Sequence, residues 1–216
     1  MSAHCCPTPS APPGNTGYRR VLWIALLVNA AMFVVEITAG AFAGSAALLA
    51  DALDFFSDAA NYGASLVALS LVPVWRSRVA LIKGCTMGIF GILVLGKAGW
   101  NAITGAAPEP LTMGTVAILA LTANVGVAVI LYRFRSGDAN MRSVWLCSRN
   151  DAIGNVAVML AALGVFGLGN AWPDLAVAAI LGALAVSSAI SIVRHALREI
   201  SEPDTAGLRF GTDHHH

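Results

Sequence analysis

Long apolar stretches separated by short polar connections dominate the chain. About 20 apolar residues, each rising 1.5 Å in a helix, cross a hydrocarbon core of about 30 Å. Six stretches reach this length: Val21–Ala43, Ala46–Val72, Val79–Ile103, Thr112–Tyr132, Ser143–Leu168 and Leu175–Val193. They lack the period-two alternation of barrel strands, and backbone groups in lipid must pair within a helix or a closed barrel. The pattern therefore predicts an all-α domain of six transmembrane helices.

Helix-breaking residues mark the connections between these stretches. They are Gly44-Ser45, Pro73, Pro108-Glu109-Pro110, Ser136-Gly137-Asp138 and Gly169-Asn170-Ala171-Trp172-Pro173. We expect residues 1–18, with four prolines, to form a disordered cytoplasmic tail rather than a cleavable signal. Residues 19–198 form the membrane domain, and residues 199–216 are too few for a second domain.

Composition and charge agree with a membrane protein. The chain is 57% hydrophobic and 12% charged, with a mean hydropathy of +0.72, whereas soluble domains carry about 25% charged residues. Of the 13 basic residues, all but Lys97 and Arg149 fall at the chain ends or in alternate connections, on one side of the membrane. The positive-inside rule then places both termini in the cytoplasm. The compact build favours a bacterial inner membrane.

The second apolar stretch contains three carboxylates, Asp51, Asp54 and Asp58. Each ionised side chain at mid-bilayer costs about 2.5–3.5 kcal/mol, so such residues face a hydrated cavity, bind protons or bind a cation. Spacings of three and four residues place all three on one helical face. For Asp51, a helix-end position at the water interface is an equal alternative.

The fifth stretch repeats this spacing with Cys147 and Asp151. Together with Asp54 and Asp58, they offer four ligands, a number that suits tetrahedral Zn²⁺, and the thiolate favours soft ions such as Zn²⁺ or Cd²⁺. Cys147 alone would more often be a packing residue. Arg149 lies two residues from both and projects away from the pair.

These residues resemble the cation diffusion facilitator family of metal–proton antiporters. The resemblance is carried by Asn29, Glu36 and Gly40, by Gly44–Asp51, by Asp54-Phe55-Phe56-Ser57-Asp58, by Asn124, by Cys147–Asn155 and by Trp172-Pro173-Asp174. It implies a six-helix bundle, metal ligands at Asp54, Asp58, Cys147 and Asp151, and accessory positions at Asp51, Glu36 and Asn155. Cys147 departs from the usual His or Asp of the family and favours cadmium.

The resemblance further implies transport by alternating access. The family's cytoplasmic metal-binding domain, which supports dimerisation, is not expected here. A homodimer would then use transmembrane contacts such as Gly40-x-x-x-Gly44 or Gly84-x-x-x-Gly88. The same glycines serve equally as internal packing, and the sequence leaves both readings open.

Charge predicts the coupling ion. Four deprotonated ligands carry −4, so the empty site retains protons that metal binding must expel. We therefore expect proton-coupled efflux of zinc or cadmium, with the metal as substrate and no resident cofactor.

Two rival functions remain. One is a membrane-embedded metal chaperone or sensor that binds without transport, and the weaker one is an intramembrane aspartyl enzyme. No Ser/His pair or H-E-x-x-H motif indicates an enzyme, and nothing indicates nucleic-acid binding. His4-Cys5-Cys6 is an incomplete metal patch, and His214–His216 is equally well a truncated tag.

Overall fold

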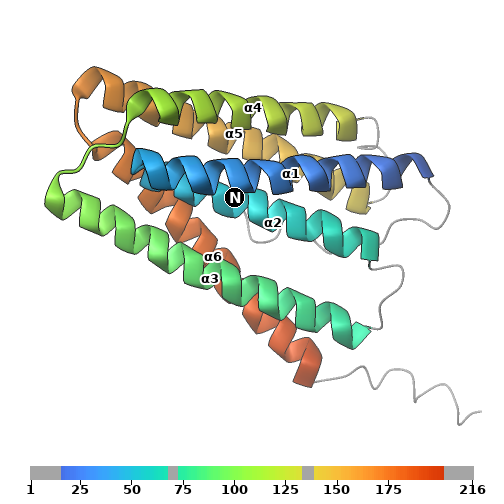
Figure 1. Ribbon diagram of the computed structural model, residues 1–216. Helices are drawn as coiled ribbons and strands as arrows, with labels where there is room; N and C mark the ends of the chain where they lie inside the picture. Colours follow the sequence, from blue (N-terminus) through green and yellow to red (C-terminus); the bar gives the residue numbers. More distant parts are fainter. Residues whose placement is uncertain (1–15, 68–72, 133–138, 202–216) are drawn as a thin grey trace, which may run out of the picture.

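The computed structural model describes the backbone of residues 16–67, 73–132 and 139–201, and the side chains of residues 17–66, 77–132 and 151–201. These ranges contain six helices: α1 (Thr16–Ala43), α2 (Ala46–Val67), α3 (Pro73–Thr104), α4 (Pro110–Tyr132), α5 (Ala139–Leu168) and α6 (Trp172–Ser201). They run back and forth across the molecule, so that α1 begins and α6 ends at the same end of the bundle (Figure 1). The predicted all-α, six-helix fold is confirmed.

The helices extend beyond the predicted apolar stretches. α1 begins at Thr16, inside the expected tail of residues 1–18, and α6 continues to Ser201. α3 begins at Pro73, where a connection was expected. Proline is well tolerated at a first helical position because its missing N–H has no intrahelical partner there. The rest of both expected tails, with their Cys and His residues, lies outside the described residues.

Five of the six described helices are long and apolar enough to cross a membrane. Their spans are Gly17–Ala43, Ser77–Thr104, Pro110–Tyr132, Asp151–Leu168 and Trp172–Ser201. The exception is α2, whose carboxylates lower its hydropathy, although its 22 residues would reach about 33 Å. Large apolar side chains such as Phe42 (87% exposed) and Ile103 (84%) cover the outside of the bundle. Water-soluble monomers rarely expose so much contiguous apolar surface, so the chain is an integral membrane protein.

The helices pack most extensively in three pairs, α1 with α2, α4 with α5, and α3 with α6. In Figure 1, α6 starts beside the left end of α1 and runs downward, so that its later part lies with α3 below the other helices. Glycine makes the α3–α6 approach close: a Cβ added at Gly84 would stand 2.9 Å from Val193, and one at Gly91 would stand 2.9 Å from Val186. Gly40 similarly faces Leu49 of α2. Of the two readings of these glycines, the structure places Gly40 and Gly84 in internal packing.

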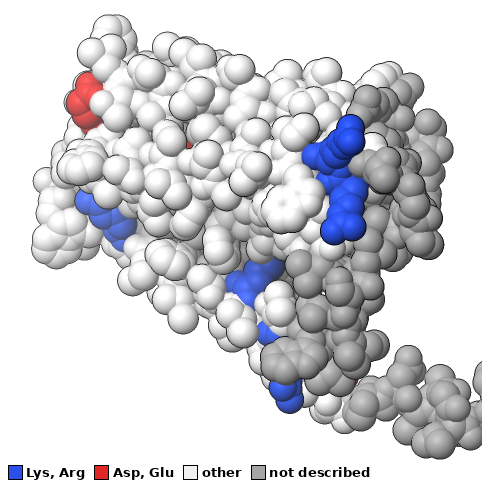
Figure 2. All heavy atoms as spheres, turned by 45° about the vertical axis from the view of Figure 1, so that its right-hand side comes forward, with Lys and Arg blue, Asp and Glu red and all other residues white. Residues whose placement is uncertain are grey.

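The bundle has two different ends. At one end, which we call the connected end, residues 44–45, 105–109 and 169–171 join α1 to α2, α3 to α4 and α5 to α6. At the other, the terminal end, α1 begins and α6 ends. Figure 2 shows most of the visible Lys and Arg surface toward the terminal end, with one further basic patch and an acidic patch toward the opposite end. The exposed arginines at the terminal end include Arg19, Arg20, Arg78, Arg194 and Arg198.

Candidate metal centre

The turn between α1 and α2 fixes where the acidic helix starts. Gly44 adopts a left-handed φ of 70°, which glycine tolerates without steric cost. The N–H of Ser45 donates to the carbonyl of Gly40 at 3.0 Å, the pairing that closes a helix C-terminus. The Ser45 hydroxyl in turn accepts from the N–H of Leu48 at 3.1 Å, capping the start of α2. Two residues therefore end one helix and begin the next.

A buried carboxylate from α6 anchors this turn. Asp174, which is fully buried, accepts hydrogen bonds from the Ser45 hydroxyl at 2.6 Å and from the N–H groups of Ala46 and Ala47 at 3.0 and 3.1 Å. A negative charge is also favoured at the N-terminus of a helix by the helix dipole. The sequence indicated Asp174 only as part of a family-like motif, and its partner was not predictable.

The three acids of α2 lie inside the bundle. Asp51 is fully buried, Asp58 is 9% exposed, and Asp54 between them is half-buried. The charges of Asp51 and Asp58 both act on Asp54, as expected for groups one helical turn apart. The helix-end alternative for Asp51 is wrong in this structure, because Asp51 has no exposure to solvent.

Helix α5 brings Asp151 to this face. Asp151 is 7% exposed, and its side chain is within hydrogen-bonding reach of Asp58. One of its carboxyl oxygens, Oδ2, has no hydrogen-bond partner among the described side chains and backbone groups. Asn155, one turn further on, donates to the backbone carbonyl of Asp151 at 2.9 Å and leaves its own Oδ1 unpaired. Two acids from two helices therefore meet in the interior, with further oxygen atoms available beside them.

Cys147 is the remaining predicted ligand. Its backbone lies in α5, four residues before Asp151, but its side chain is outside the described set. Among the side chains that the structure does describe, no group of three or more His, Cys, Asp or Glu residues is arranged to hold a metal ion. The four-ligand assignment of Asp54, Asp58, Cys147 and Asp151 therefore stays a prediction.

A second acidic pair lies deeper in the bundle. Glu36 of α1 and Asp51 of α2 are both fully buried and are close enough to interact directly. No described N–H or O–H group donates to any of their four carboxyl oxygens. Two adjacent carboxylates buried without donors would repel each other strongly, so this pair requires a proton or a cation.

Lys83 is the described cation that stands nearest to the acids of α2. Its Nζ donates to the side-chain carbonyl of Asn61 on α2 at 2.5 Å, and its charge acts on Asp54 and Asp58. Sequence reasoning grouped Lys83 with the basic residues of a connection, and the structure corrects this to a half-buried position within α3. The sequence did contain a sign of this position, because Lys83 lies four residues after the start of the predicted stretch Val79–Ile103.

Comparisons with known proteins agree with this architecture. Residues 22–201 match the family described as Cation efflux transmembrane domain. Similar proteins include a cadmium, cobalt and zinc/H(+)-K(+) antiporter of Bacillus velezensis, 26% identical over 85% of this chain and 63% of its own length. The metal cation efflux system protein CzcD of Cupriavidus metallidurans is 25% identical over 91% and 66%. The zinc transporter ZitB of Escherichia coli is 26% identical over 90% and 66%.

The matched region coincides with the helical bundle described above. The chain spans about two thirds of the length of these relatives, and the family match extends from α1 to the last residue of α6. Six helices with buried acids on α2 and α5 are what the sequence resemblance implied. The chain therefore belongs to the cation efflux family of integral membrane proteins, the cation diffusion facilitators.

Proposed function

We propose that this protein moves a divalent transition metal, zinc or cadmium, out of the cytoplasm in exchange for protons. Asp54 and Asp58 of α2 and Cys147 and Asp151 of α5 are the proposed ligands. Glu36, Asp51 and Asn155 lie around them as accessory positions. The metal is the transported substrate, and the bundle alternates between access from one side and from the other.

The meeting of Asp58 and Asp151 is the observation that carries this proposal. Two helices each deliver a carboxylate to one buried point, where two like charges are unfavourable unless a cation or a proton lies between them. The relatives named above are a cadmium, cobalt and zinc antiporter, a metal cation efflux protein and a zinc transporter. Their names indicate the class of cation. The carboxylates are hard ligands, and the proposed Cys147 thiolate would give the site one soft ligand.

The same charges support exchange with protons. Four deprotonated ligands carry −4, and a dication reduces this to −2. Ligands bind metal in their deprotonated forms, so loading the metal releases protons and unloading it takes them up. An inward proton gradient then drives metal outward.

The distribution of basic side chains supports the orientation. The positive-inside rule places an excess of Lys and Arg on the cytoplasmic side, and the exposed arginines at the terminal end therefore favour a cytoplasmic location for that end. Both termini are accordingly proposed to be cytoplasmic, and the membrane is proposed to be a bacterial inner membrane. A homodimer through the membrane helices remains part of this proposal.

Metal flux into proteoliposomes tests the proposal. Asp58→Asn and Asp151→Asn keep the side-chain shape and remove one charge each, so each is expected to reduce zinc flux at least about 100-fold, since an essential charge-assisted ligand contributes several kcal/mol. Glu109→Gln, a matched carboxyl-to-amide change in the connection between α3 and α4, is expected to leave flux unchanged. Retained flux in both Asp variants would overturn the site.

Two further measurements separate transport from its rivals. Wild-type flux should rise with an imposed pH gradient, and flux that ignores the gradient contradicts proton coupling. Zinc binding without any flux in the wild-type protein would instead support a metal-binding chaperone or sensor.

Cys147→Ser tests the soft ligand. A hydroxyl is a harder and poorer ligand than a thiolate, so cadmium binding is expected to fall more than cobalt binding. Equal losses for both ions would remove Cys147 from the metal site.

A further inference from the structure

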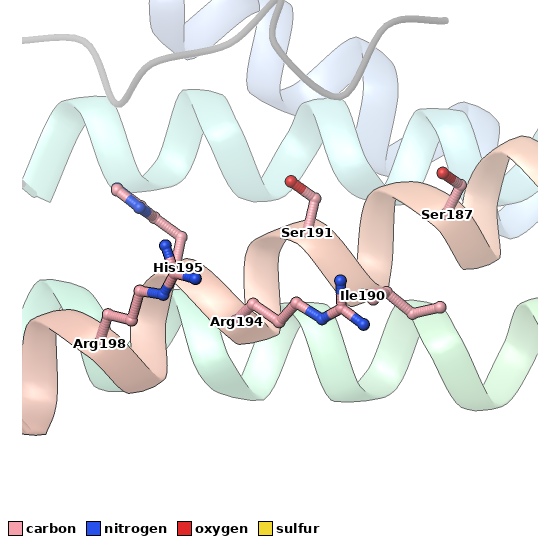
Figure 3. A pocket seen from close by; sticks show the side chains of 6 residues that line it. All are labelled: Ser187, Ile190, Ser191, Arg194, His195 and Arg198. Carbon is pink, nitrogen blue, oxygen red and sulfur yellow. The ribbon is translucent and has the colours of Figure 1, made fainter.

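A polar hollow lies on α6 near the terminal end, away from the acidic site. Its volume is about 380 Å³, and its described lining consists of Ser187, Ile190, Ser191, Arg194, His195 and Arg198. These positions recur every three to four residues and so form one stripe along the helix. Figure 3 shows Ser187, Ser191 and His195 projecting to the same side of α6, with the guanidinium group of Arg198 turned toward His195. We call this feature the α6 hollow.

The hydroxyl groups of the α6 hollow are free to bind a ligand. Hydroxyls elsewhere in the described helices, such as Thr115 and Thr122, donate to the carbonyl four residues earlier, both at 2.8 Å. Ser187 and Ser191 make no such bond and have no hydrogen-bond partner among the described residues. Two donors one turn apart therefore face the hollow unpaired.

Among the described residues, the two arginines of the α6 hollow also form no ion pair. Within the described part of the chain, the ion pair of this region joins His195 to Glu199 at 3.1 Å and involves neither Arg194 nor Arg198. Like charges four residues apart on a helix repel each other. A role of Arg198 in neutralising the C-terminal end of α6 explains neither Arg194 nor the two serines. An oxyanion between the guanidinium groups would relieve their repulsion and accept from the serines.

The depth of the α6 hollow indicates where such an anion comes from. α6 has 30 residues, and a rise of 1.5 Å per residue places Arg194 and Arg198 about 33–39 Å from its first residue. A bilayer has about 30 Å of hydrocarbon and reaches about 40–45 Å with its headgroups. The two guanidinium groups thus stand at the headgroup level of one leaflet. Ile190, which is 46% exposed, presents apolar surface to the acyl chains below them.

We propose that the α6 hollow binds the phosphate of an anionic phospholipid. Arg194 and Arg198 hold two of its oxygens by charge-assisted hydrogen bonds, and Ser191 and Ser187, deeper along α6, donate to the lipid oxygens below it, those of the phosphate and of the acyl esters. A headgroup without an ammonium group is preferred, because a choline or ethanolamine cation would face the arginines. Basic pockets at a membrane surface recognise such headgroups by the same chemistry.

Native mass spectrometry of the full chain tests this site. The purified protein is delipidated and titrated with phosphatidylglycerol or phosphatidylcholine. Wild-type protein is expected to retain phosphatidylglycerol at least about tenfold better than phosphatidylcholine, and Arg194→Gln/Arg198→Gln is expected to lose this preference. Ser187→Ala/Ser191→Ala should reduce it about threefold. Arg19→Gln/Arg20→Gln removes two exposed arginines from the same end of the bundle and should leave it unchanged.

Four outcomes would overturn the proposal. One is equal phosphatidylglycerol retention by Arg194→Gln/Arg198→Gln and the wild-type protein. Another is an equal loss in the Arg19→Gln/Arg20→Gln control, which would indicate general attraction to anionic lipid. The third is a thermal shift by inorganic phosphate, in phosphatidylcholine nanodiscs, as large as that by phosphatidylglycerol, which would indicate a free-anion site. Arg194→Lys/Arg198→Lys keeps both charges, and its failure to retain more phosphatidylglycerol than the Gln variant would also count against the site.

Discussion

The two ends of the bundle are held together by different means. At the connected end, Asp174 binds the first turn of α2 through three hydrogen bonds. Asn101 of α3 donates to the carbonyl of Gly44 at 2.9 Å, and the N–H of Glu109 donates to the carbonyl of Ala43, also at 2.9 Å. The turn between α1 and α2 is therefore tied to α3, to the connection before α4, and to α6.

The terminal end is linked by other polar side chains of its described helices. Ser77 of α3 donates to Glu199 of α6 at 2.6 Å, and Lys83 donates to Asn61. Close packing also joins α3 to α6, with Gly84 set against Ile192 and Val193.

This difference bears on how α2 can move. Its first turn is fixed, whereas Asp54 and Asp58 lie 8 and 12 residues beyond Ala46, or about 12–18 Å along the helix at 1.5 Å per residue. A small tilt about the fixed turn would displace these acids while leaving the Asp174 bonds intact. The connected end is thus suited to be a pivot in the proposed alternating access.

The largest expected effect on stability comes from removing the Asp174 carboxylate. Asp174→Ala removes three hydrogen bonds and leaves three buried donors, the Ser45 O–H and the N–H groups of Ala46 and Ala47, without their acceptor. The expected loss is about 3 kcal/mol, or a fall in Tm of about 6–12 °C for a chain of this size. Thermal unfolding in detergent measures it.

Two companion variants sharpen the contrast between the ends. Asp174→Asn keeps an acceptor and should lose about half as much stability. Ser77→Ala removes the hydrogen bond between α3 and α6 at the terminal end and should cost about 1 kcal/mol. A Ser77→Ala loss equal to that of Asp174→Ala would contradict the proposed difference between the ends.

The second prediction concerns packing between α3 and α6. A Cβ at Gly84 would lie 2.9 Å from Val193 and 3.0 Å from Ile192, whereas one at Gly99 meets nothing within 4 Å. Overpacking costs about 1–3 kcal/mol, while Gly→Ala in a free helical position gains about 0.5–1 kcal/mol. Gly84→Ala should therefore lower Tm and Gly99→Ala should raise it. Shifts of the same sign would refute close packing at Gly84.

A third, smaller effect is expected at Asn101. Asn101→Ala removes the single bond to Gly44 from a residue that is 1% exposed, at a cost of about 1 kcal/mol. Thr104→Ala is the control, because Thr104 is exposed and donates only to the carbonyl of Trp100 in its own helix. Urea unfolding of both variants in micelles measures the difference. Equal midpoints would show that the α3 link to the turn adds no stability.

The sequence predicted the helices because the bilayer allows so few alternatives. Even α2 was found, although Asp51, Asp54 and Asp58 lower its hydropathy, because the residues around the acids are apolar. The helix ends were less predictable, since helices run on into the headgroup region where hydropathy gives no signal. Thr16 and Ser201 lie in such extensions.

The candidate site was predictable only within each helix. Helical spacing placed Asp54 and Asp58 on one face, but their meeting with Asp151 depends on how α2 and α5 pack. Local sequence patterns do not predict contacts between distant residues. Asp174 and Ser45 are 129 residues apart, and no periodicity in the sequence indicates that they pair.

The smallest expected effect is a pH dependence at the connected end. Hydrogen bonds from Thr112 and from the N–H of Leu111 hold the pKa of Glu109 below its ordinary value of 4.5. A depressed carboxyl pKa contributes stability at pH values above the unfolded pKa and loses it as pH falls through the folded one. The Tm difference between wild-type protein and Glu109→Gln should therefore be constant from about pH 7 to pH 5 and shrink below about pH 4.5. The amide keeps the backbone bond to Ala43, so the comparison isolates the charge, and a Tm difference that does not change with pH would show that this carboxylate does not stabilise the start of α4.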